Sequence, residues 1–147
     1  MRTLTALLFS LLLISCTYDQ EESKVRAEIN SIIPSESLKI DNDCVITAVN
    51  IHTALTNHKI LNCEFKEIIF CEFKFPNNNK VQGHALTVFI YPAGSNKLYA
   101  ADEQGTIRIR EYIDTPLEIA KKFMAIRNPS AQITRGYYVT KEFYIEL

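Results

Sequence analysis

Apolar residues recur at helical spacing in the stretch that spans residues 43–57. Steps of four, three and four residues separate Cys44, Ala48, Ile51 and Leu55. This spacing places all four on one face and predicts a helix over residues 43–57 that packs into a core. Asn42 and Asp43, just before the apolar stripe, are residue types that cap helix N-termini. A shorter helical period covers residues 25–33 and ends at Pro34.

Segments rich in aromatic and β-branched side chains predict a set of strands after this helix. The expected strands span residues 60–75, 83–91, 97–102, 106–110 and 135–147. Turn signals separate the first four of them, at residues 76–80, at residues 92–96 and at Gln104-Gly105. Before the last strand, residues 115–118 have the form of a capping box with Pro116 at the first helical position, which predicts a helix as far as Arg127. The order of the elements predicts an α+β fold.

A register for the strands at residues 83–91 and 97–102 follows from the length of the loop between them. If the loop has the five residues 92–96, Tyr91 faces Lys97 and Leu86 faces Asp102. His84 and Asp102 then lie on the same face of the sheet as diagonal neighbours, about 7–8 Å apart at the backbone. A shift of one residue would move Asp102 to the opposite face.

The beginning of the chain has a pattern of its own. Arg2 precedes an apolar run over residues 3–14, which is followed by Ser15 and Cys16. The run has the length of a signal-peptide core and is too short to span a bilayer as a helix. Residues 13–16 (LISC) resemble the lipobox of bacterial lipoproteins, in which the cysteine is lipidated and becomes the new N-terminus. An ordinary signal peptide or a short anchor, with Cys16 incidental, is the alternative.

The lipobox resemblance implies a signal peptide over residues 1–15, lipidation at Cys16, and anchoring to a bacterial membrane on its periplasmic or extracellular face. Residues 16–24 are polar and have no apolar period, so we expect a tether there. No internal repeat and no Pro/Gly-rich linker divides the chain after the tether. We therefore expect one domain over residues 25–147.

Composition excludes several classes of function. The 147 residues include 16 basic and 17 acidic side chains, a formal net charge of −1, which gives no electrostatic footprint for nucleic acid. The sequence has no Cys-x-x-Cys pair, no His-Glu-x-x-His pair and no glycine-rich phosphate loop. We therefore expect neither a metal nor a cofactor.

Three residues carry the candidate chemistry: Cys44, His84 and Asp102. Each has an ordinary explanation, as a small buried hydrophobe or half of a disulfide, as a histidine at the edge of the core, and as a turn residue. Together they have the types required for a nucleophile, a base and an orienting carboxylate. Cys44 in the first turn of the predicted helix would lie near free backbone N–H groups that stabilise a thiolate.

The segments around these positions resemble the papain-like superfamily of cysteine peptidases, and most of all its transglutaminase-like and bacteriocin-leader-type members. The matching segments are residues 43–45 (DCV), 83–88 (GHALTV) and 99–102 (YAAD). The resemblance implies a papain-like fold, in which an N-terminal helix bearing the cysteine packs on an antiparallel β-sheet. It also implies that Cys44 is the nucleophile, that His84 is the base and that Asp102 orients His84.

The sequence departs from this family at the expected oxyanion donor. Papain-type enzymes commonly place a glutamine about six residues before the cysteine, to stabilise the oxyanion that forms in the reaction. That position is Leu38 here, and the chain has no Trp, a residue frequent around such sites. The backbone N–H of Cys44 and the side chain of Asn42 are then the candidate donors.

One principal hypothesis and two alternatives follow. The principal hypothesis is a cell-envelope lipoprotein that acts as a cysteine peptidase, amidase or acyltransferase on peptide or amide bonds. Its partners would be a peptide or protein substrate, with cell-wall peptides among the candidates, and a membrane that holds the lipid anchor. The first alternative is a catalytically inactive papain-like lipoprotein that serves as a binding or immunity-type module. The second is an unrelated α+β lipoprotein of cystatin-like shape.

The remaining cysteines of the expected domain allow several pairings. Cys63 and Cys71 are eight residues apart, too far to bond on one continuous strand. If a hairpin turned near residues 66–67, they would face each other and could form a disulfide, which leaves Cys44 as the unpaired thiol. A bond from Cys44 to either of them would instead abolish the enzyme hypothesis.

Overall fold

The computed structural model describes residues 44–57, 62–109, 113 and 115–139, together with seven residues between 20 and 31. Two helices and five strands follow one another in the order α2, β1–β4, α3, β5. This order confirms the predicted α+β class. The elements are α2 (Cys44–Asn57), β1 (Glu64–Phe75), β2 (Asn78–Ile90), β3 (Leu98–Asp102), β4 (Gly105–Ile109), α3 (Pro116–Arg127) and β5 (Gln132–Tyr138).

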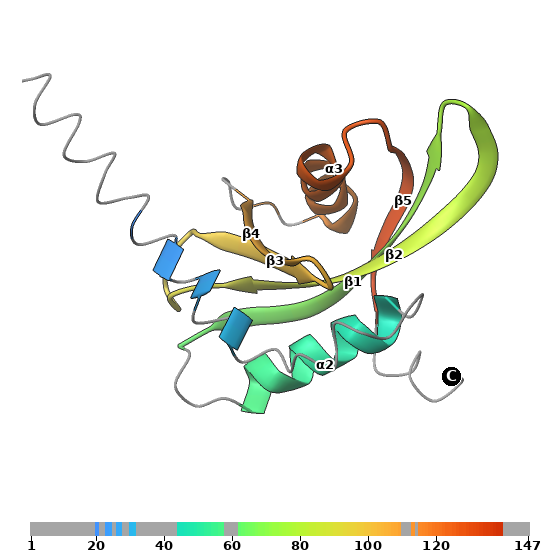
Figure 1. Cartoon of the computed structure of the whole chain (residues 1–147). Coiled ribbons are helices and arrows are strands. Elements are labelled where there is room, and N and C mark those ends of the chain that lie inside the picture. Colours follow the sequence, from blue (N-terminus) through green and yellow to red (C-terminus); the bar gives the residue numbers. More distant parts are fainter. Residues whose placement is uncertain are drawn as a thin grey trace, which may run out of the picture.

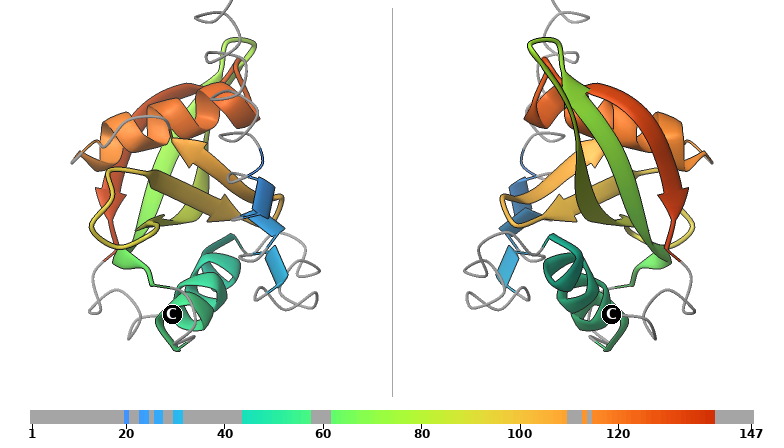
Figure 2. Two further views of the ribbon diagram at one scale, coloured as in Figure 1. Left: turned by 90° about the vertical axis from the view of Figure 1, so that its left-hand side faces the viewer. Right: turned by 90° about the vertical axis from the view of Figure 1, so that its right-hand side faces the viewer.

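The strands form one antiparallel sheet in the order β4-β3-β2-β1-β5. Helix α2 lies against one face of the sheet and α3 against the other (Figure 1). The views in Figure 2 show the same three layers from two sides. Strands β1 and β2 form a long hairpin whose tip extends beyond both helices. The β-sheet is therefore the central layer, and its two faces can present groups to two different helices.

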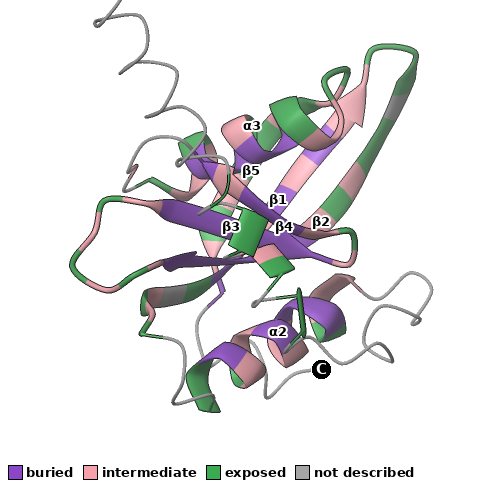
Figure 3. Ribbon diagram, turned by 60° about the vertical axis from the view of Figure 1, so that its left-hand side comes forward, coloured by how far each residue is buried: buried purple, intermediate pink, exposed green. Residues whose placement is uncertain are grey.

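The alternation of side chains along the strands divides the core into two parts. On the α3 side, the aliphatic residues Leu86, Val88 and Ile90 of β2 join β1, β3 and β4 against α3. On the α2 side, Ala85 and Phe89 pack with the apolar stripe of the helix. Strand β3 is buried along its whole length, as Figure 3 shows in purple. The fully buried stripe of α2 is the predicted one, with Ala48, Ile51 and Leu55.

The register of the β2–β3 hairpin is the one that the loop length predicts. Thr87 pairs with Ala101 and Ile90 with Leu98, and the Tyr91 N–H donates to the Lys97 carbonyl at 3.2 Å. Continuing this register places His84 and Asp102 on the same face, the one covered by α3. The sequence-based hairpin is therefore confirmed at the positions on which the candidate site depends.

Several predicted boundaries were wrong by a few residues. Strand β2 begins at Asn78 rather than residue 83, because the turn of the long hairpin needs only residues 76–77. Strand β5 begins at Gln132 rather than residue 135 and ends at Tyr138, and residues 140–147 of the predicted strand lie outside the described residues. The predicted capping box does not form, because Thr115 makes no side-chain cap hydrogen bond. Glu118 instead accepts a hydrogen bond from Lys121 at 2.7 Å.

The structure has no disulfide between Cys63 and Cys71, so the pairing in which they bond is wrong, whereas the alternative of two unbonded thiols agrees with it. Neither cysteine is in a disulfide, and the same holds for Cys44. Residues 66–67 do not form a hairpin turn; they lie within β1, which continues through a bulge between Glu64 and Glu67. On this continuous strand the two cysteines are too far apart to bond.

The N-terminal predictions fall largely outside the described residues. These include the signal peptide over residues 1–15, the lipidation residue Cys16 and the oxyanion candidate Asn42. Seven residues of the expected tether and of the helix predicted over residues 25–33 are described, and all seven are helical. They are Gln20, Ser23, Lys24, Arg26, Ala27, Asn30 and Ser31. Asn30 accepts a hydrogen bond from Thr106 of β4 at 3.0 Å. Within the part of the chain that the structure describes, no helix has the length and apolar character needed to cross a bilayer.

Gly136 allows α3 to approach β5 unusually closely. A Cβ atom at this position would lie 2.8 Å from the Leu117 Cα and 3.0 Å from the Pro116 carbonyl oxygen. Both contacts are with backbone, which cannot move aside as the end of a flexible side chain can. The start of α3 is therefore seated directly on the edge strand.

We predict that Gly136→Ala destabilises the domain by about 1–3 kcal/mol, because the new methyl group forces the helix away from the sheet. Urea unfolding of both proteins measures the difference in the free energy of unfolding. Gln132→Ala, at an exposed position of the same strand, is the matched control and should change it by less than about 0.5 kcal/mol. Equal stability of Gly136→Ala and wild type would contradict the close approach.

Candidate functional site

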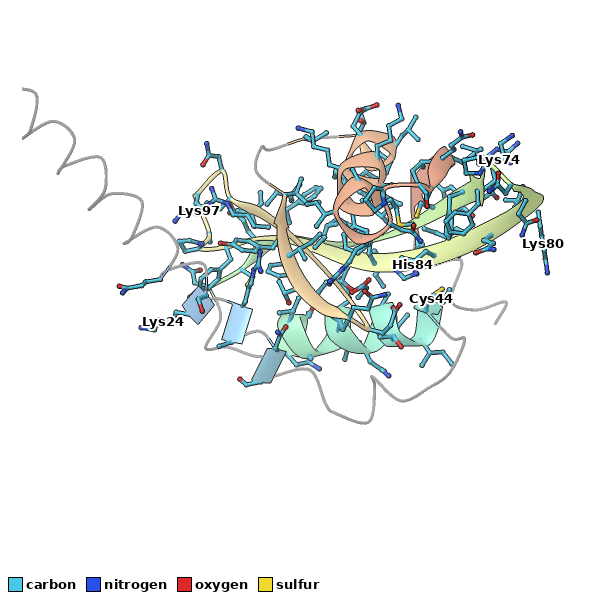
Figure 4. The ribbon with its side chains drawn as sticks, turned by 45° about the horizontal axis from the view of Figure 1, so that its top comes forward. Lys24, Cys44, Lys74, Lys80, His84 and Lys97 are labelled. Atoms are coloured by element: carbon cyan, nitrogen blue, oxygen red, sulfur yellow. The ribbon has the colours of Figure 1, made fainter. Side chains whose placement is uncertain are left out.

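Cys44 is the first residue of α2 and lies where the helix begins on the sheet. Its half-buried side chain packs against Ala48, Ile68 and Ala85. The N–H groups of the first helical turn have no partner within the helix, and they give this end partial positive charge. The Cys44 thiol also lies close enough to the His84 ring to raise the pKa of the imidazole. In Figure 4 the labelled Cys44 lies at the start of α2, and the labelled His84 lies on the sheet next to it.

His84 contacts Asp102 as well. Its Nε2 lies 3.3 Å from Asp102 Oδ2. The His84 side chain is 15% exposed, and that of Asp102 is 1% exposed. Because Nε2 points to Asp102, Nδ1 is the ring nitrogen left for Cys44. The three residues singled out from the sequence therefore form one connected chain of contacts.

The end of the β2–β3 pairing explains how Cys44 and His84 can meet. Cys44 packs on the α2 side of the sheet, whereas the His84 ring stacks on Phe123 of α3, with centroids 6.0 Å apart and an interplanar angle of 19°. β3 pairs with β2 only from Thr87 onward. Between Thr87 and His84, no strand in the described part of the chain pairs with the edge of β2 that faces β3. A side chain from α2 can therefore pass this open edge and reach the His84 ring.

Asp102 is also held by Arg127, the last residue of α3. Arg127 Nη2 donates to Asp102 Oδ1 at 2.9 Å and to the Gly105 carbonyl at 2.7 Å. The backbone N–H of Gln104 donates to the same Oδ1 at 3.0 Å. The two oxygens of the carboxylate therefore have separate tasks, since Oδ1 is anchored and Oδ2 faces His84.

The environment of His84 favours its protonated form. Burial of the ring acts to lower its pKa, but the hydrogen bonds with Asp102 and Cys44 and the charges of Glu103 and Asp102 outweigh burial. Together they raise the pKa of His84 from its usual 6.5 to about 9. His84 is therefore an imidazolium at neutral pH.

A second thiol lies close to the site but has a different environment. Cys71 is directly opposite His84 in the β1–β2 pairing and is fully buried. Burial, with a smaller effect from Cys44, raises the pKa of Cys71 to about 12, although a hydrogen bond with the His84 backbone acts against this. Cys71 is therefore a protonated core residue, and Cys44 is the candidate nucleophile.

Three residues with possible metal-ligand atoms lie close together, and His84 is one of them. Among the residues that the structure describes, His84, Asp102 and Glu103 are the group whose ligand atoms lie close enough for a metal ion, all within 4.8 Å of one another. Glu103 Oε2 is 4.0 Å from His84 Nε2. The Asp102 oxygens already have partners in Arg127, Gln104 and His84, so metal binding would break the Asp102–His84 contact. Hydrogen bonds account for the Asp102 oxygens, whereas the buried Oε2 of Glu103 has no hydrogen-bond partner among the described residues.

Sequence reasoning missed Phe123, Arg127 and Glu103. In the sequence, Arg127 is only the last residue of the predicted helix, and Phe123 belongs to an ordinary apolar helix face. Glu103 is adjacent to Asp102 in a turn, a place where acidic residues are common. Their contact with the site depends on how α3 is placed over the sheet, and no local pattern carries that information.

No family model, no curated protein and no solved structure matches this chain. The site therefore has to be interpreted from its own geometry.

We predict that stability decreases as pH rises toward 9. The pKa of His84 is higher in the folded chain than in the unfolded one, so its stabilising contribution is complete below pH 6.5 and is lost as pH rises through about 9. Urea unfolding between pH 6 and 9 should show a loss of a few kcal/mol in the free energy of unfolding. In His84→Gln, which does not titrate, this loss should be smaller. The same pH dependence in both proteins would contradict the assignment.

Proposed function

We propose that this chain is a cysteine hydrolase or acyltransferase that acts on peptide or amide bonds. Cys44 is its nucleophile, His84 its general base and acid, and Asp102 the residue that orients His84. The observation that carries the proposal is the continuous contact from the Cys44 thiol through the His84 ring to the buried Asp102 carboxylate. A buried carboxylate, an imidazole and a thiol at a helix start have the roles of a catalytic triad.

In the first half of the reaction, the Cys44 thiolate attacks the carbonyl carbon of the substrate and a carbon–sulfur bond forms. The carbonyl oxygen takes the negative charge of a tetrahedral intermediate. The imidazolium of His84 gives its proton to the departing amine as the carbon–nitrogen bond breaks. This leaves an acyl thioester on Cys44 and a neutral His84, whose ring Asp102 holds in place.

In the second half, neutral His84 takes a proton from water, and the oxygen attacks the thioester carbonyl. The carbon–sulfur bond breaks, the carboxylic acid leaves, and the thiolate–imidazolium pair is restored. If an amine takes the place of water, the product is a new amide and the enzyme is an acyltransferase. The same residues serve both reactions.

Stabilisation of the oxyanion would begin at the start of α2. The backbone N–H of Cys44 belongs to the first turn, where such groups have no helical partner, and it is close to the attacking sulfur by covalent geometry. Asn42 stays the candidate second donor. Its amide can supply the hydrogen bond that the glutamine of papain-type enzymes supplies.

The wider setting follows from the resemblances in the sequence. We propose a papain-like α+β domain anchored to a bacterial membrane through a lipid on Cys16, facing the periplasm or the exterior. Its substrate would be a peptide or protein in the cell envelope, with cell-wall peptides as candidates. The near-neutral charge of the chain gives no electrostatic footprint for a nucleic-acid substrate.

We predict that iodoacetamide alkylates Cys44 at least about tenfold faster than Cys63 at pH 6, because the nearby imidazolium stabilises the thiolate. Cleavage after Lys39, Lys59, Lys66 and Lys74 places Cys44, Cys63 and Cys71 on separate peptides, so mass spectrometry can follow each thiol in one sample. Cys71 should stay unmodified while the protein is folded.

His84→Ala should slow the alkylation of Cys44 to a rate near that of Cys63. His52→Ala removes another half-buried histidine, one that lies within α2, and is the matched control; it should leave the rate unchanged. If Cys44 is no faster than Cys63 and His84→Ala has no effect, the hydrolase proposal is wrong. The binding or immunity-type module is then the better hypothesis.

We predict that p-nitrophenyl acetate, a general acyl donor, releases one equivalent of nitrophenolate per protein in a burst and then turns over slowly. The burst reports transfer of the acetyl group to Cys44, and the slow phase reports thioester hydrolysis. Cys44→Ser should abolish the burst. Asp102→Asn should reduce the slow phase by at least about tenfold, because His84 loses its orientation. Equal release by Cys44→Ser and wild type would refute the assigned nucleophile.

A further inference from the structure

Arg127 and Phe123 lie one helical turn apart at the end of α3, and together they face both members of the His84–Asp102 pair. The His84 ring stacks on the Phe123 ring, and the Arg127 guanidinium lies over that same ring, 5.7 Å from its centroid. The i, i+4 spacing puts both side chains on one helix face. Helix α3 therefore contacts the imidazole through one residue and the carboxylate through the other.

The hydrogen bonds of Arg127 fix the orientation of the Asp102 carboxylate. Arg127 and the Gln104 N–H both donate to Oδ1, at 2.9 and 3.0 Å. Rotation of the carboxylate would break both bonds, so Oδ2 stays turned toward His84. Arg127 is itself held by the Gly105 carbonyl at 2.7 Å, and its side chain is 18% exposed.

Charge gives a second reason for the arrangement. Asp102 is 1% exposed, and a buried carboxylate requires a compensating charge or several hydrogen bonds. Arg127 supplies a permanent cation beside this carboxylate, whether His84 is protonated or neutral. Because His84 changes its protonation state during the proposed reaction, Asp102 needs a partner whose charge does not change.

We propose that Arg127 is a positioning residue of the site, which keeps the Asp102 carboxylate turned toward His84 throughout the reaction. It acts through Asp102 and does not touch the substrate. The inference rests on the proposed function, since it gives α3 a role in the chemistry of Cys44. The geometric part of it, the effect of Arg127 on His84, can be measured without any activity.

The primary test is an NMR titration of the His84 ring in wild type, Arg127→Met and Arg127→Lys. Removal of the cation alone would raise the pKa of His84, whereas loss of the Asp102 orientation would lower it. We expect the second effect to dominate, with a pKa in Arg127→Met at least about one unit below that of wild type. Arg127→Lys, which keeps the charge, should lie between the two.

The matched control is Lys121→Met, which removes a cation from the same helix at an exposed position whose partner is Glu118. It should leave the titration of His84 unchanged. A pKa in Arg127→Met that is unchanged or raised would overturn the proposal, and Arg127 would then serve only to hold α3 on the sheet. If Arg127→Met does not fold, Arg127→Lys serves as the test. A positioning role of Arg127 requires that the pKa of His84 is lower in Arg127→Lys than in wild type.

A double-mutant cycle tests whether Arg127 acts through Asp102. In the wild-type background, Arg127→Met should slow iodoacetamide alkylation of Cys44 at pH 6 by about tenfold. In the Asp102→Asn background, the same change should have little further effect. Additive losses would overturn the proposal. If wild-type Cys44 is itself unreactive, the proposed function fails, while the NMR titration still decides the role of Arg127.

Discussion

A buried carboxylate has to be paired, and the position of Asp102 at the meeting point of four elements satisfies this requirement. Asp102 ends β3, and its partners are His84 on β2, Gln104 in the turn to β4 and Arg127 at the end of α3. Each partner comes from a different part of the chain, so the pairing also ties the layers of the fold together. The rest of the site depends on this arrangement, because it determines where the imidazole points.

The imidazole then connects the two sides of the sheet. His84 stacks on α3 and hydrogen-bonds the thiol at the start of α2. The link is possible because β3 is short and leaves the edge of β2 beside His84 without a neighbouring strand in the described part. A longer β3 would cover this edge. The short length of β3 is therefore a condition for the contact between His84 and Cys44.

Much of this geometry could be predicted from local sequence. The helical stripe that includes Ala48, Ile51 and Leu55 identifies the face of α2 that is buried. The five-residue loop after Tyr91 is enough to set the register that brings His84 and Asp102 to one face. Both features depend on residues close together in the chain, where periodicity and turn length are informative.

The parts that escaped prediction depend on contacts over longer distances. Arg127 is 25 residues from Asp102, and its role appears only when α3 lies on the sheet. The predicted Cys63–Cys71 disulfide does not form because β1 continues through a bulge between Glu64 and Glu67 and does not turn back there.

The coupling between Cys44 and His84 is the central claim, and a titration of His84 in wild type and in Cys44→Ala tests it most directly. Part of the raised pKa of His84 comes from its hydrogen bond with Cys44. The account predicts a pKa near 9 in wild type and a clearly lower one in Cys44→Ala, with Cys63→Ala unchanged. Identical titration of His84 in all three proteins would show that the sulfur and the imidazole do not interact.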